Sequence, residues 1–219
     1  MIKKVVIVAG GPIELWPDLS EYQDDSSVAW VGVDRGCLNG LQAGIKFTFG
    51  VGDFDSVDEI EKKHIADQIG KLEPFPAEKN ATDTELGLLK AVETFPKAEE
   101  YLLIGVTGGR MDHFLANLWL PFRDQLQLFK SRIVLKDRQN SIRYFEPGTY
   151  TIVKEPDKKY LAFVCLTAVT GLSLYDAKYQ LDKYQTALPM SWASNEFIGE
   201  TTRFSFETGE LCVIQSKDD

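Results

Sequence analysis

The N-terminal part of the chain alternates between apolar runs and amphipathic stretches. The apolar runs are short, nearly continuous and rich in β-branched side chains, which is typical of strands buried on both faces of a sheet. Buried strands are therefore predicted at these positions. The runs cover residues 4–9, 28–33, 47–51 and 101–106.

The amphipathic stretches between these runs have the spacing of helices. Apolar residues recur near helical spacing over residues 57–69, with charges between them, and residues 84–95 repeat the pattern. Further helices are expected over residues 35–43 and after Gly109, where Pro121 should end the helix. Strands that alternate with helices indicate βαβ units, so we predict a Rossmann-like α/β domain with a mainly parallel sheet.

The pattern changes near residues 137–140. Beyond this point, short β-rich runs are separated by turn signals that contain Gly, and no convincing helical pattern remains. We therefore predict two domains, an α/β domain over residues 1–138 and an antiparallel β-sandwich over residues 139–219. The β-rich runs cover residues 142–145, 150–153, 160–167, 172–175, 202–206 and 211–215.

The composition is that of an ordinary globular protein with an acidic balance. Of 219 residues, 24 are Lys or Arg and 33 are Asp or Glu, which gives a net charge of −9. This surplus argues against a nucleic-acid partner, which would need a basic face. A single anionic nucleotide can still bind where local cations or a metal ion outweigh the repulsion.

The cysteines and the N-terminus narrow the setting further. The 3 cysteines stand apart in sequence and form neither a CxxC pair nor a cluster with histidine, so neither a zinc site nor a disulfide scaffold is predicted. The apolar run at residues 5–9 is too short for a secretory signal or a membrane span. We therefore expect a cytoplasmic protein that does not bind membranes.

Two carboxylates, Asp53 and Asp55, follow the predicted strand at residues 47–51. Side chains at i and i+2 of an extended chain point to the same side, so both could reach one Mg²⁺, which binds one or two carboxylates together with phosphate oxygens. The alternative is a plain turn in which Asp55 or Ser56 caps the next helix. The pair alone does not decide between these interpretations.

A second cluster opens the predicted helix at residues 84–95. Thr82 and Glu85 have the spacing of a capping box. A helix N-terminus also favours anions, and Lys79 adds a positive charge beside it. Asp83 on this first turn could supply a third carboxylate to the metal. A helix cap and a nucleotide site are compatible here.

A third cluster follows the last of the predicted parallel strands. Gly108 and Gly109 permit close approach of the backbone to a phosphate. Arg110 can bind a phosphate through two N–H groups or lie flat against an aromatic base. Asp112 could be only a helix cap and His113 only a packed ring, but their combination with Gly-Gly-Arg favours a binding role.

Arg35 is a fourth and weaker candidate, a phosphate ligand after the strand at residues 28–33. Neither GxGxxG nor GxxxxGK[ST] occurs there, so the common dinucleotide and P-loop fingerprints are absent. The clusters that contain Arg35, Asp53 and Gly108 follow predicted strands, and the carboxyl edge of an open α/β sheet is where ligands bind.

Taken together, these motifs resemble those of bacterial thiamine pyrophosphokinases. Their order and spacing extend over most of the chain, including the β-rich half. One departure is Asn80, where the family usually has Asp. The matching segments are VGVDRG (31–36), VGDFDS (51–56), NATDTELGL (80–88), TGGRMDHFLANL (107–118) and SNEF (194–197).

The resemblance implies a homodimer of two-domain subunits with active sites at the subunit interface. It implies transfer of a pyrophosphoryl group from ATP to the hydroxyl of thiamine, giving thiamine diphosphate and AMP. Asp53, Asp55 and Asp83 would hold Mg²⁺, and Asp83 is also a candidate to accept the hydroxyl proton. Residues expected near the nucleotide are Arg35, Lys79, Thr82, Gly108, Gly109, Arg110, Asp112 and His113.

The thiamine side of the site is expected in the second domain. By the same resemblance, Ser194 and Asn195 would face the thiamine ring. Trp192 could stack on the thiazolium cation, although an ordinary aromatic residue of a sandwich explains it equally well.

Two other functions stay open on the sequence alone. A glycosyltransferase could use Asp-x-Asp to hold a nucleotide sugar with Mn²⁺, and a sensor could bind thiamine or a nucleotide without turnover. Retention of the metal-type carboxylates argues against the sensor, because a cation such as thiamine would not need all of them.

Overall fold

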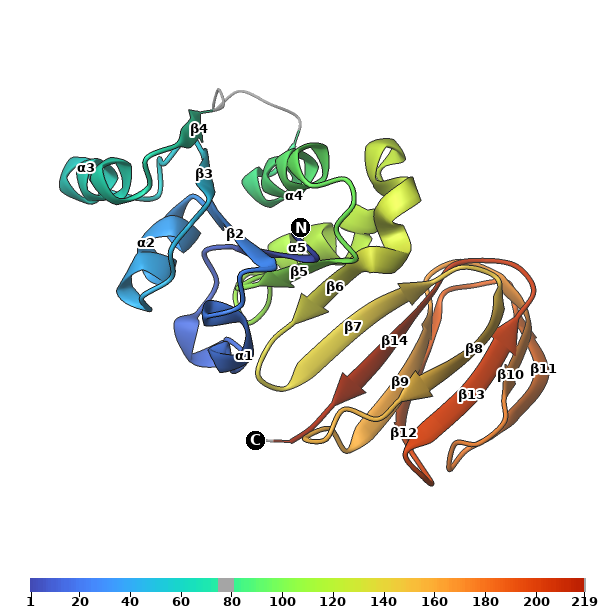
Figure 1. The fold of residues 1–219 in the computed structure, drawn as a ribbon. Coiled ribbons are helices and arrows are strands. Elements are labelled where there is room, and N and C mark those ends of the chain that lie inside the picture. The colour runs from blue at the N-terminus through green and yellow to red at the C-terminus, as the bar shows by residue number, and fades with distance from the viewer. Residues whose placement is uncertain (75–80, 219) are drawn as a thin grey trace. The chain divides into compact units, whose positions relative to one another are not determined.

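The computed structural model describes residues 1–74 and 81–218, and the chain divides into two compact units, Met1–Arg138 and Gln139–Asp219 (Figure 1). Lys79 and Asn80 therefore lie outside the described residues. Each unit has its own buried core.

The first unit is built on a parallel sheet with the strand order β6-β5-β1-β2-β3-β4. Its central strands consist largely of fully buried Val, Ile and Leu, as expected for a sheet covered on both faces. The predicted α/β fold with a mainly parallel sheet is confirmed. The strands are β1 (Lys4–Val8), β2 (Val28–Val33), β3 (Phe49–Gly52), β4 (Leu72–Pro74), β5 (Glu100–Ile104) and β6 (Ile133–Lys136).

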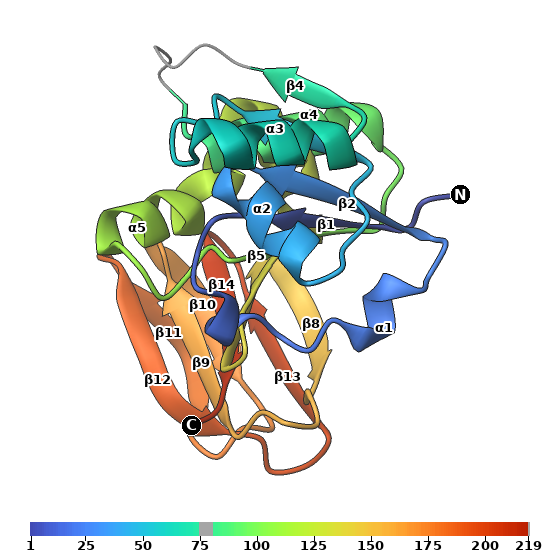
Figure 2. The same ribbon diagram turned by 90° about the vertical axis from the view of Figure 1, so that its left-hand side faces the viewer.

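Helices cover both faces of this sheet (Figure 2). On one face, a Cβ atom added at Gly32 of β2 would lie only 2.5 Å from the sulfur of Cys37 in α2. On the other face, a side chain at Gly87 of α4 would lie 2.5 Å from Val33 Cγ2. Glycine at these positions lets each helix approach the sheet closely.

Helices α2 to α5 agree with the predicted helices in place and type, whereas the short helix α1 was not predicted. Pro121 lies in a 3₁₀ turn directly after α5, which ends the helix as expected. The helices are α1 (Ser20–Gln23), α2 (Arg35–Gln42), α3 (Glu59–Gln68), α4 (Asp83–Thr94) and α5 (Met111–Trp119), with 3₁₀ segments at Ile13–Leu15, Leu120–Phe122 and Asp124–Arg132.

The second unit is an antiparallel β-sandwich, as predicted. Strands β12, β9, β14 and β7 pair in that order, and strands β11, β10, β13 and β8 form the facing sheet. The strands are β7 (Asn140–Phe145), β8 (Gly148–Val153), β9 (Tyr160–Cys165), β10 (Val169–Leu174), β11 (Leu181–Thr186), β12 (Met190–Glu196), β13 (Thr201–Phe206) and β14 (Leu211–Ser216).

Alternating side chains of these strands fill the space between the two sheets. Phe204 is fully buried and lies 5.1 Å, ring centre to ring centre, from both Phe145 and Phe163. Leu161 and Leu211 belong to the same apolar cluster. This core explains why the unit forms a compact body.

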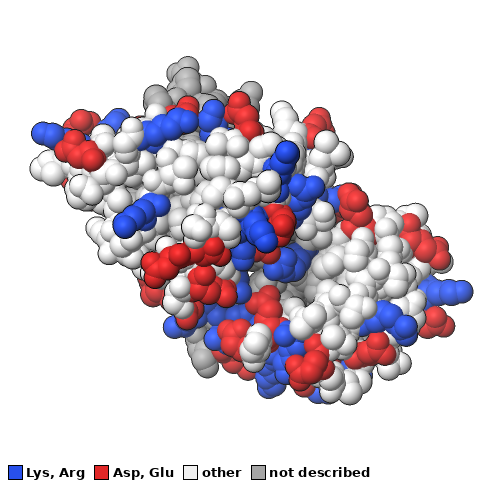
Figure 3. All heavy atoms as spheres, viewed as in Figure 1, with Lys and Arg blue, Asp and Glu red and all other residues white. Residues whose placement is uncertain are grey.

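Charged side chains of both signs are interspersed on the face shown in Figure 3. Among the described residues, the helices are too short or too polar to cross a bilayer.

Candidate active site

The strand order of the first unit reverses direction at β1. Strand β2 pairs with one edge of β1, and β5 pairs with the other. Loops that leave the carboxyl ends of such strands diverge, which opens a crevice at this switch point. A cavity of about 530 Å³ lies there, a volume typical of small-molecule sites. The predicted residues that line it are Arg35, Thr82, Asp83, Gly109, Arg110 and His113.

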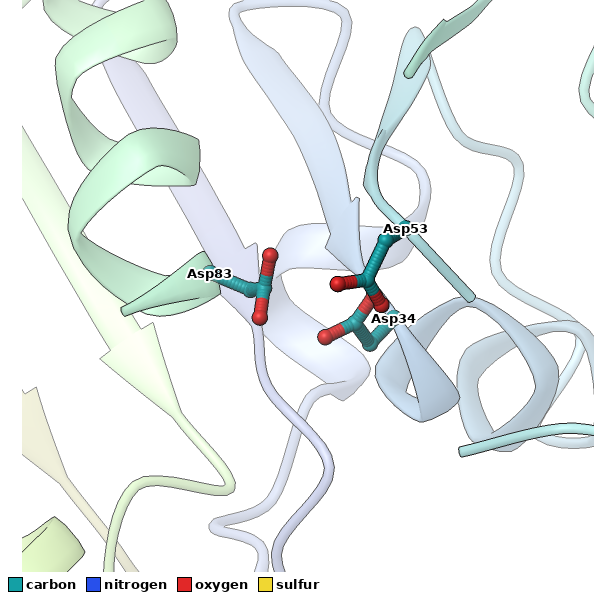
Figure 4. Close-up of side chains that lie close together, drawn as sticks. All are labelled: Asp34, Asp53 and Asp83. Carbon is teal, nitrogen blue, oxygen red and sulfur yellow. The ribbon is translucent and has the colours of Figure 1, made fainter. Parts of the chain in front are cut away.

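Three carboxylates converge beside this cavity: Asp34, Asp53 and Asp83 (Figure 4). Asp34 follows β2, Asp53 follows β3, and Asp83 is the first residue of α4. One oxygen from each lies within 4.8 Å of the others, and all three side chains are partly buried. Oxygens at this spacing can share a single divalent cation.

Asp34 has a backbone conformation that residues with side chains rarely adopt, with φ 46° and ψ −125°. Its N–H donates to the carbonyl of Val51 at 2.9 Å, and its Oδ1 accepts from the N–H of Phe54 at 3.2 Å. A Cβ at Gly52 would collide with that same carboxylate oxygen, so glycine is required there. These contacts hold the Asp34 side chain against the end of β3.

The surroundings of Asp34 raise the pKa of its carboxyl to about 7. Burial is the largest cause, and the negative charge of Asp83 adds to it, while the hydrogen bond from the Phe54 N–H opposes the shift. Close carboxylates repel one another unless a proton or a cation lies between them. A hard divalent cation such as Mg²⁺ fits this all-oxygen set of ligands.

Asp55 is not part of the converging group, although it was predicted there. The prediction assumed an extended backbone, in which residues i and i+2 share a side. Phe54 instead has φ 58°, which breaks that alternation, and the side chain of Asp55 is exposed. The N–H of Asp55 donates to Asp53 Oδ1 at 3.1 Å, so the segment forms a turn.

The sequence interpretation did not include Asp34 in the candidate metal site. The available signal was its place directly after a buried strand, next in the sheet to the strand that precedes Asp53. The turn after β3 also does not cap α3, because Asp58 does so through bonds to the N–H groups of Ile60 and Glu61.

The start of α4 presents Thr82 and Asp83 to the cavity. Thr82 caps the helix by accepting from the N–H of Glu85 at 3.2 Å. The predicted capping box is only half formed, because the buried Glu85 carboxylate pairs with Arg123 Nε at 3.1 Å. Capping thus fixes the first turn that carries Asp83.

The loop after β5 forms the opposite wall. The N–H of Gly11 donates to the carbonyl of Gly105 at 2.8 Å, which ties this loop to the end of β1. Gly108 has φ 77° and packs against Leu15, so its conformation and its space both require glycine. Two further contacts were not predicted: Asn117 Nδ2 donates to the Val106 carbonyl at 3.1 Å, and the Thr107 hydroxyl donates to the buried Asp137 at 2.7 Å.

Arg110 is directed to a neighbouring carboxylate. Its Nε and Nη2 donate to the two oxygens of Asp112 at 3.1 and 2.6 Å. The guanidinium accordingly lowers the pKa of Asp112. Both side chains are largely exposed, so the pair stays open to exchange with another anion.

The residues predicted to contact thiamine lie in the second unit, on or beside β12. Asn195 is buried, and its side chain is engaged with the backbone of residue Tyr179, accepting at 2.9 Å and donating at 2.8 Å. Ser194 is exposed with φ 59° at an irregularity of the strand pairing. Trp192 is half-buried and packs edge-on against Tyr184, with ring centres 5.0 Å apart.

Fold and site together define a class of protein: an α/β domain with an acidic candidate metal site at the carboxyl edge of its parallel sheet, followed in sequence by a β-sandwich. Residues 21–134 match the family model "Thiamin pyrophosphokinase, catalytic domain", and residues 149–211 match "Thiamin pyrophosphokinase, vitamin B1 binding domain". The chain belongs to the thiamin pyrophosphokinase family, whose members are transferases. The predicted family and enzyme class are confirmed.

Relatives and solved structures agree with this assignment over the full length. Thiamine pyrophosphokinase of Bacillus subtilis (strain 168) is 39% identical over 219 residues, covering 99% of this chain and 100% of the relative. A thiamin pyrophosphokinase family protein from Enterococcus faecalis is 48% identical with a TM-score of 0.94, covering 99% and 100% of the two chains. Thiamin pyrophosphokinase from Candida albicans shares the fold, with a TM-score of 0.78 at 15% identity. The match covers 99% of this chain and 90% of the Candida albicans chain.

Proposed function

We propose that this chain transfers a pyrophosphoryl group from ATP to the hydroxyl of thiamine, giving thiamine diphosphate and AMP. The observation that carries the proposal is the convergence of Asp34, Asp53 and Asp83 beside a cavity at the switch point of the sheet, which Asp34 and Asp83 line. Membership of the thiamin pyrophosphokinase family over both units supplies the identity of the two substrates.

The metal site is assigned to Asp34, Asp53 and Asp83, with Asp34 in place of the initially predicted Asp55. Mg²⁺ bound there would neutralise charge on the phosphate oxygens of ATP, the main requirement of phosphoryl transfer. Asp83, at the cavity wall, is the candidate to accept the proton of the attacking hydroxyl.

The remaining lining residues bind and orient the nucleotide in this scheme. Gly109 allows the backbone to approach a phosphate, and nothing lies within 4 Å of the place where its Cβ would be. Arg110 would exchange its bond to Asp112 for phosphate oxygens, and Thr82 and His113 also line the cavity. Lys79, outside the described residues, stays a candidate for the same task.

The second unit is proposed to bind the vitamin. Trp192, which is partly buried against the core of the sandwich, is the proposed aromatic partner of the thiazolium cation, and Ser194, two residues later, has an exposed side chain. Asn195 has its polar groups committed to Tyr179, so we assign it the task of shaping β12.

We further propose a cytoplasmic homodimer with active sites at the subunit interface. One face of α5 carries an exposed apolar stripe, Met111, Leu115 and Trp119, at intervals of four residues. Their exposed fractions are 68%, 38% and 49%, and an exposed stripe of large apolar residues is typical of an association surface. The helix begins directly after Arg110, so a partner on this stripe would lie beside the cavity.

The direct test is incubation of the pure protein with thiamine, ATP and Mg²⁺, with separation of all nucleotide and thiamine products. Thiamine diphosphate and AMP should form in equal amounts, and chelation of the metal should stop both. Formation of thiamine monophosphate with ADP would refute transfer of a pyrophosphoryl group. A UDP- or GDP-sugar consumed with Mn²⁺ and without AMP would instead indicate a glycosyltransferase.

A further inference from the structure

We propose that Arg35 is a positioning residue: it fixes the loop that carries Asp53 and thereby sets the geometry of the candidate metal site. The inference rests on the metal role that the proposed function gives to this site. Arg35 is the first residue of α2 and lines the cavity, where a phosphate ligand was expected. Its hydrogen bonds instead connect α2 to the loop after β3.

The guanidinium of Arg35 is committed to the backbone. Its Nε and Nη2 donate to the carbonyl oxygen of Ser56 at 3.2 and 2.9 Å. Nη2 also lies 4.0 Å from a carboxylate oxygen of Glu61 in α3. Two donors of one planar group that meet on a single acceptor fix the orientation of the side chain.

The adjacent residue holds the same loop at its other end. Asp34 Oδ1 accepts from the N–H of Phe54 at 3.2 Å, and the Phe54 ring is buried in a cluster with Ile65. Phe54 has φ 58°, a conformation that persists only where its surroundings maintain it. Residues 34 and 35 therefore hold the loop by hydrogen bonds on both sides of Asp55.

These hydrogen bonds determine where Asp53 lies. Asp53 begins the loop, and its oxygen reaches within 4.8 Å of those of Asp34 and Asp83. If the bond to Ser56 is lost, the loop can relax and Asp53 can leave the group. Residues that orient metal ligands in this way typically change metal affinity by about 10- to 100-fold when substituted.

If Arg35 acted only through its charge, its replacement would change the metal affinity in the opposite direction. A cation near a metal site repels the metal, so its removal alone should tighten metal binding. Loss of positioning should weaken it. The direction of the change therefore separates the two roles.

The experiment measures Mn²⁺ binding to the nucleotide-free protein by the electron paramagnetic resonance signal of free Mn²⁺. For Arg35→Gln we expect the Kd for Mn²⁺ to rise about 10-fold or more. An unchanged or lower Kd would overturn the inference. This readout does not depend on turnover.

Matched variants complete the test. Arg35→Lys keeps the charge but cannot place two donors on the Ser56 carbonyl, so its Kd should rise as well; a wild-type Kd in this variant overturns the inference. Lys63→Gln removes an exposed charge from α3 and should leave the Kd unchanged. Circular dichroism checks that the variants fold. If Arg35→Gln does not fold, the Kd of Arg35→Lys tests the inference.

Asp53→Asn separates this inference from the metal assignment itself. Equal Mn²⁺ affinity in the wild type and Asp53→Asn would remove the metal role from the site. Weaker binding in Asp53→Asn together with unchanged binding in both Arg35 variants would leave that role intact and overturn only the positioning by Arg35.

Discussion

Asp34 combines a strained backbone with a close set of partners. Its φ of 46° is held by a hydrogen bond to Val51 on one side and by the Phe54 N–H on the other. Strained residues with side chains persist where the surrounding structure over-determines them, and they gather at functional sites. The carboxylate of this residue lies close to those of Asp53 and Asp83 (Figure 4).

Substitution of individual aspartates should show that Asp53, a member of the converging group, matters more for activity than its neighbour Asp55. Asp53→Asn replaces one proposed carboxylate ligand of the metal with a neutral amide, so we expect turnover to fall at least about tenfold, or about 1.4 kcal/mol in the barrier. Asp55→Asn alters an exposed residue outside the group and should have a smaller effect. Steady-state assays at varied Mg²⁺ check this order.

Urea unfolding of both variants provides the control, because neither side chain supports a core. A turnover for Asp55→Asn as low as that for Asp53→Asn would contradict the assignment of the three ligands.

The raised pKa of Asp34 makes the stability of the metal-free protein depend on pH. Its ordinary value is 3.8 and its value in the folded protein is about 7. Between these values the folded state holds a proton that the unfolded state has lost, so this contribution to stability is complete below about pH 4 and is lost as the pH rises through about 7.

Asp34→Asn should remove that part of the pH dependence, since Asn keeps an acceptor for the Phe54 N–H but does not ionise. The measurement is the free energy of unfolding in urea, with chelator present, for both proteins across this pH range. Parallel curves for the two proteins would refute the raised pKa.

Sequence reasoning located the edge of the sheet better than it located the individual ligands. Asp53 and Asp83 could be predicted because each is next to a strand end or a helix start with a clear pattern. Asp55 was placed in the group because the left-handed conformation of Phe54 is not visible in the residue type. Phe carries no signal for positive φ, whereas Gly or Asn would. Asp34 was left out although its place directly after a buried strand is visible in the sequence.

The contact of Gly87 in helix α4 with strand β2 shows how packing between elements supports the site. A Cβ at Gly87 would lie 2.5 Å from Val33 Cγ2, one residue before Asp34. Helix α4 also carries Asp83 on its first turn. The contact of α4 with the sheet therefore fixes two of the three carboxylates relative to each other.

Gly87→Ala should destabilise the protein even though Ala favours helices. The clash forces α4 away from β2, so we expect a loss of about 1–3 kcal/mol in the free energy of unfolding. Gly70→Ala is the matched control, because nothing lies within 4 Å of its added carbon, and its change should stay within about 0.5 kcal/mol. Denaturant unfolding distinguishes the two; an equally stable Gly87→Ala protein would rule out tight packing at this contact.

Four strands were not predicted, for two physical reasons. Strands β11 and β12 are largely exposed, with polar residues on both faces, so their sequences lack the alternation that marks a half-buried strand. The short strands β4 and β6 offer too few residues to show a period. Long buried strands such as β1 and β2 were predicted because burial on both faces leaves a continuous apolar run.

The two units of the chain carry different parts of the proposed site. The cavity and its carboxylates belong to the first unit, and Trp192 and Ser194 belong to the second. If association of two subunits completes the active site, as proposed, dimerisation takes part in catalysis and not only in stability.

The apolar stripe on α5 gives this proposal a direct test. Leu115→Glu places a charge in the middle of the stripe, between Met111 and Trp119, and burial of an unpaired charge in an interface is unfavourable. We expect self-association to weaken at least about tenfold, equivalent to about 1.4 kcal/mol, and synthesis of thiamine diphosphate to fall with it. Sedimentation velocity over a range of protein concentrations measures the association.

Leu128→Glu makes the same chemical change at a leucine that is 87% exposed and outside the stripe, so it should leave both association and activity unchanged. A Leu115→Glu protein that stays dimeric, or a wild type that is monomeric and fully active, would show that α5 serves another purpose. If the variant becomes monomeric and loses activity while circular dichroism shows an intact fold, the active site depends on the partner subunit. Because α5 begins directly after Arg110, a partner lying on this helix would contribute to the wall of the cavity that is proposed to bind the phosphates.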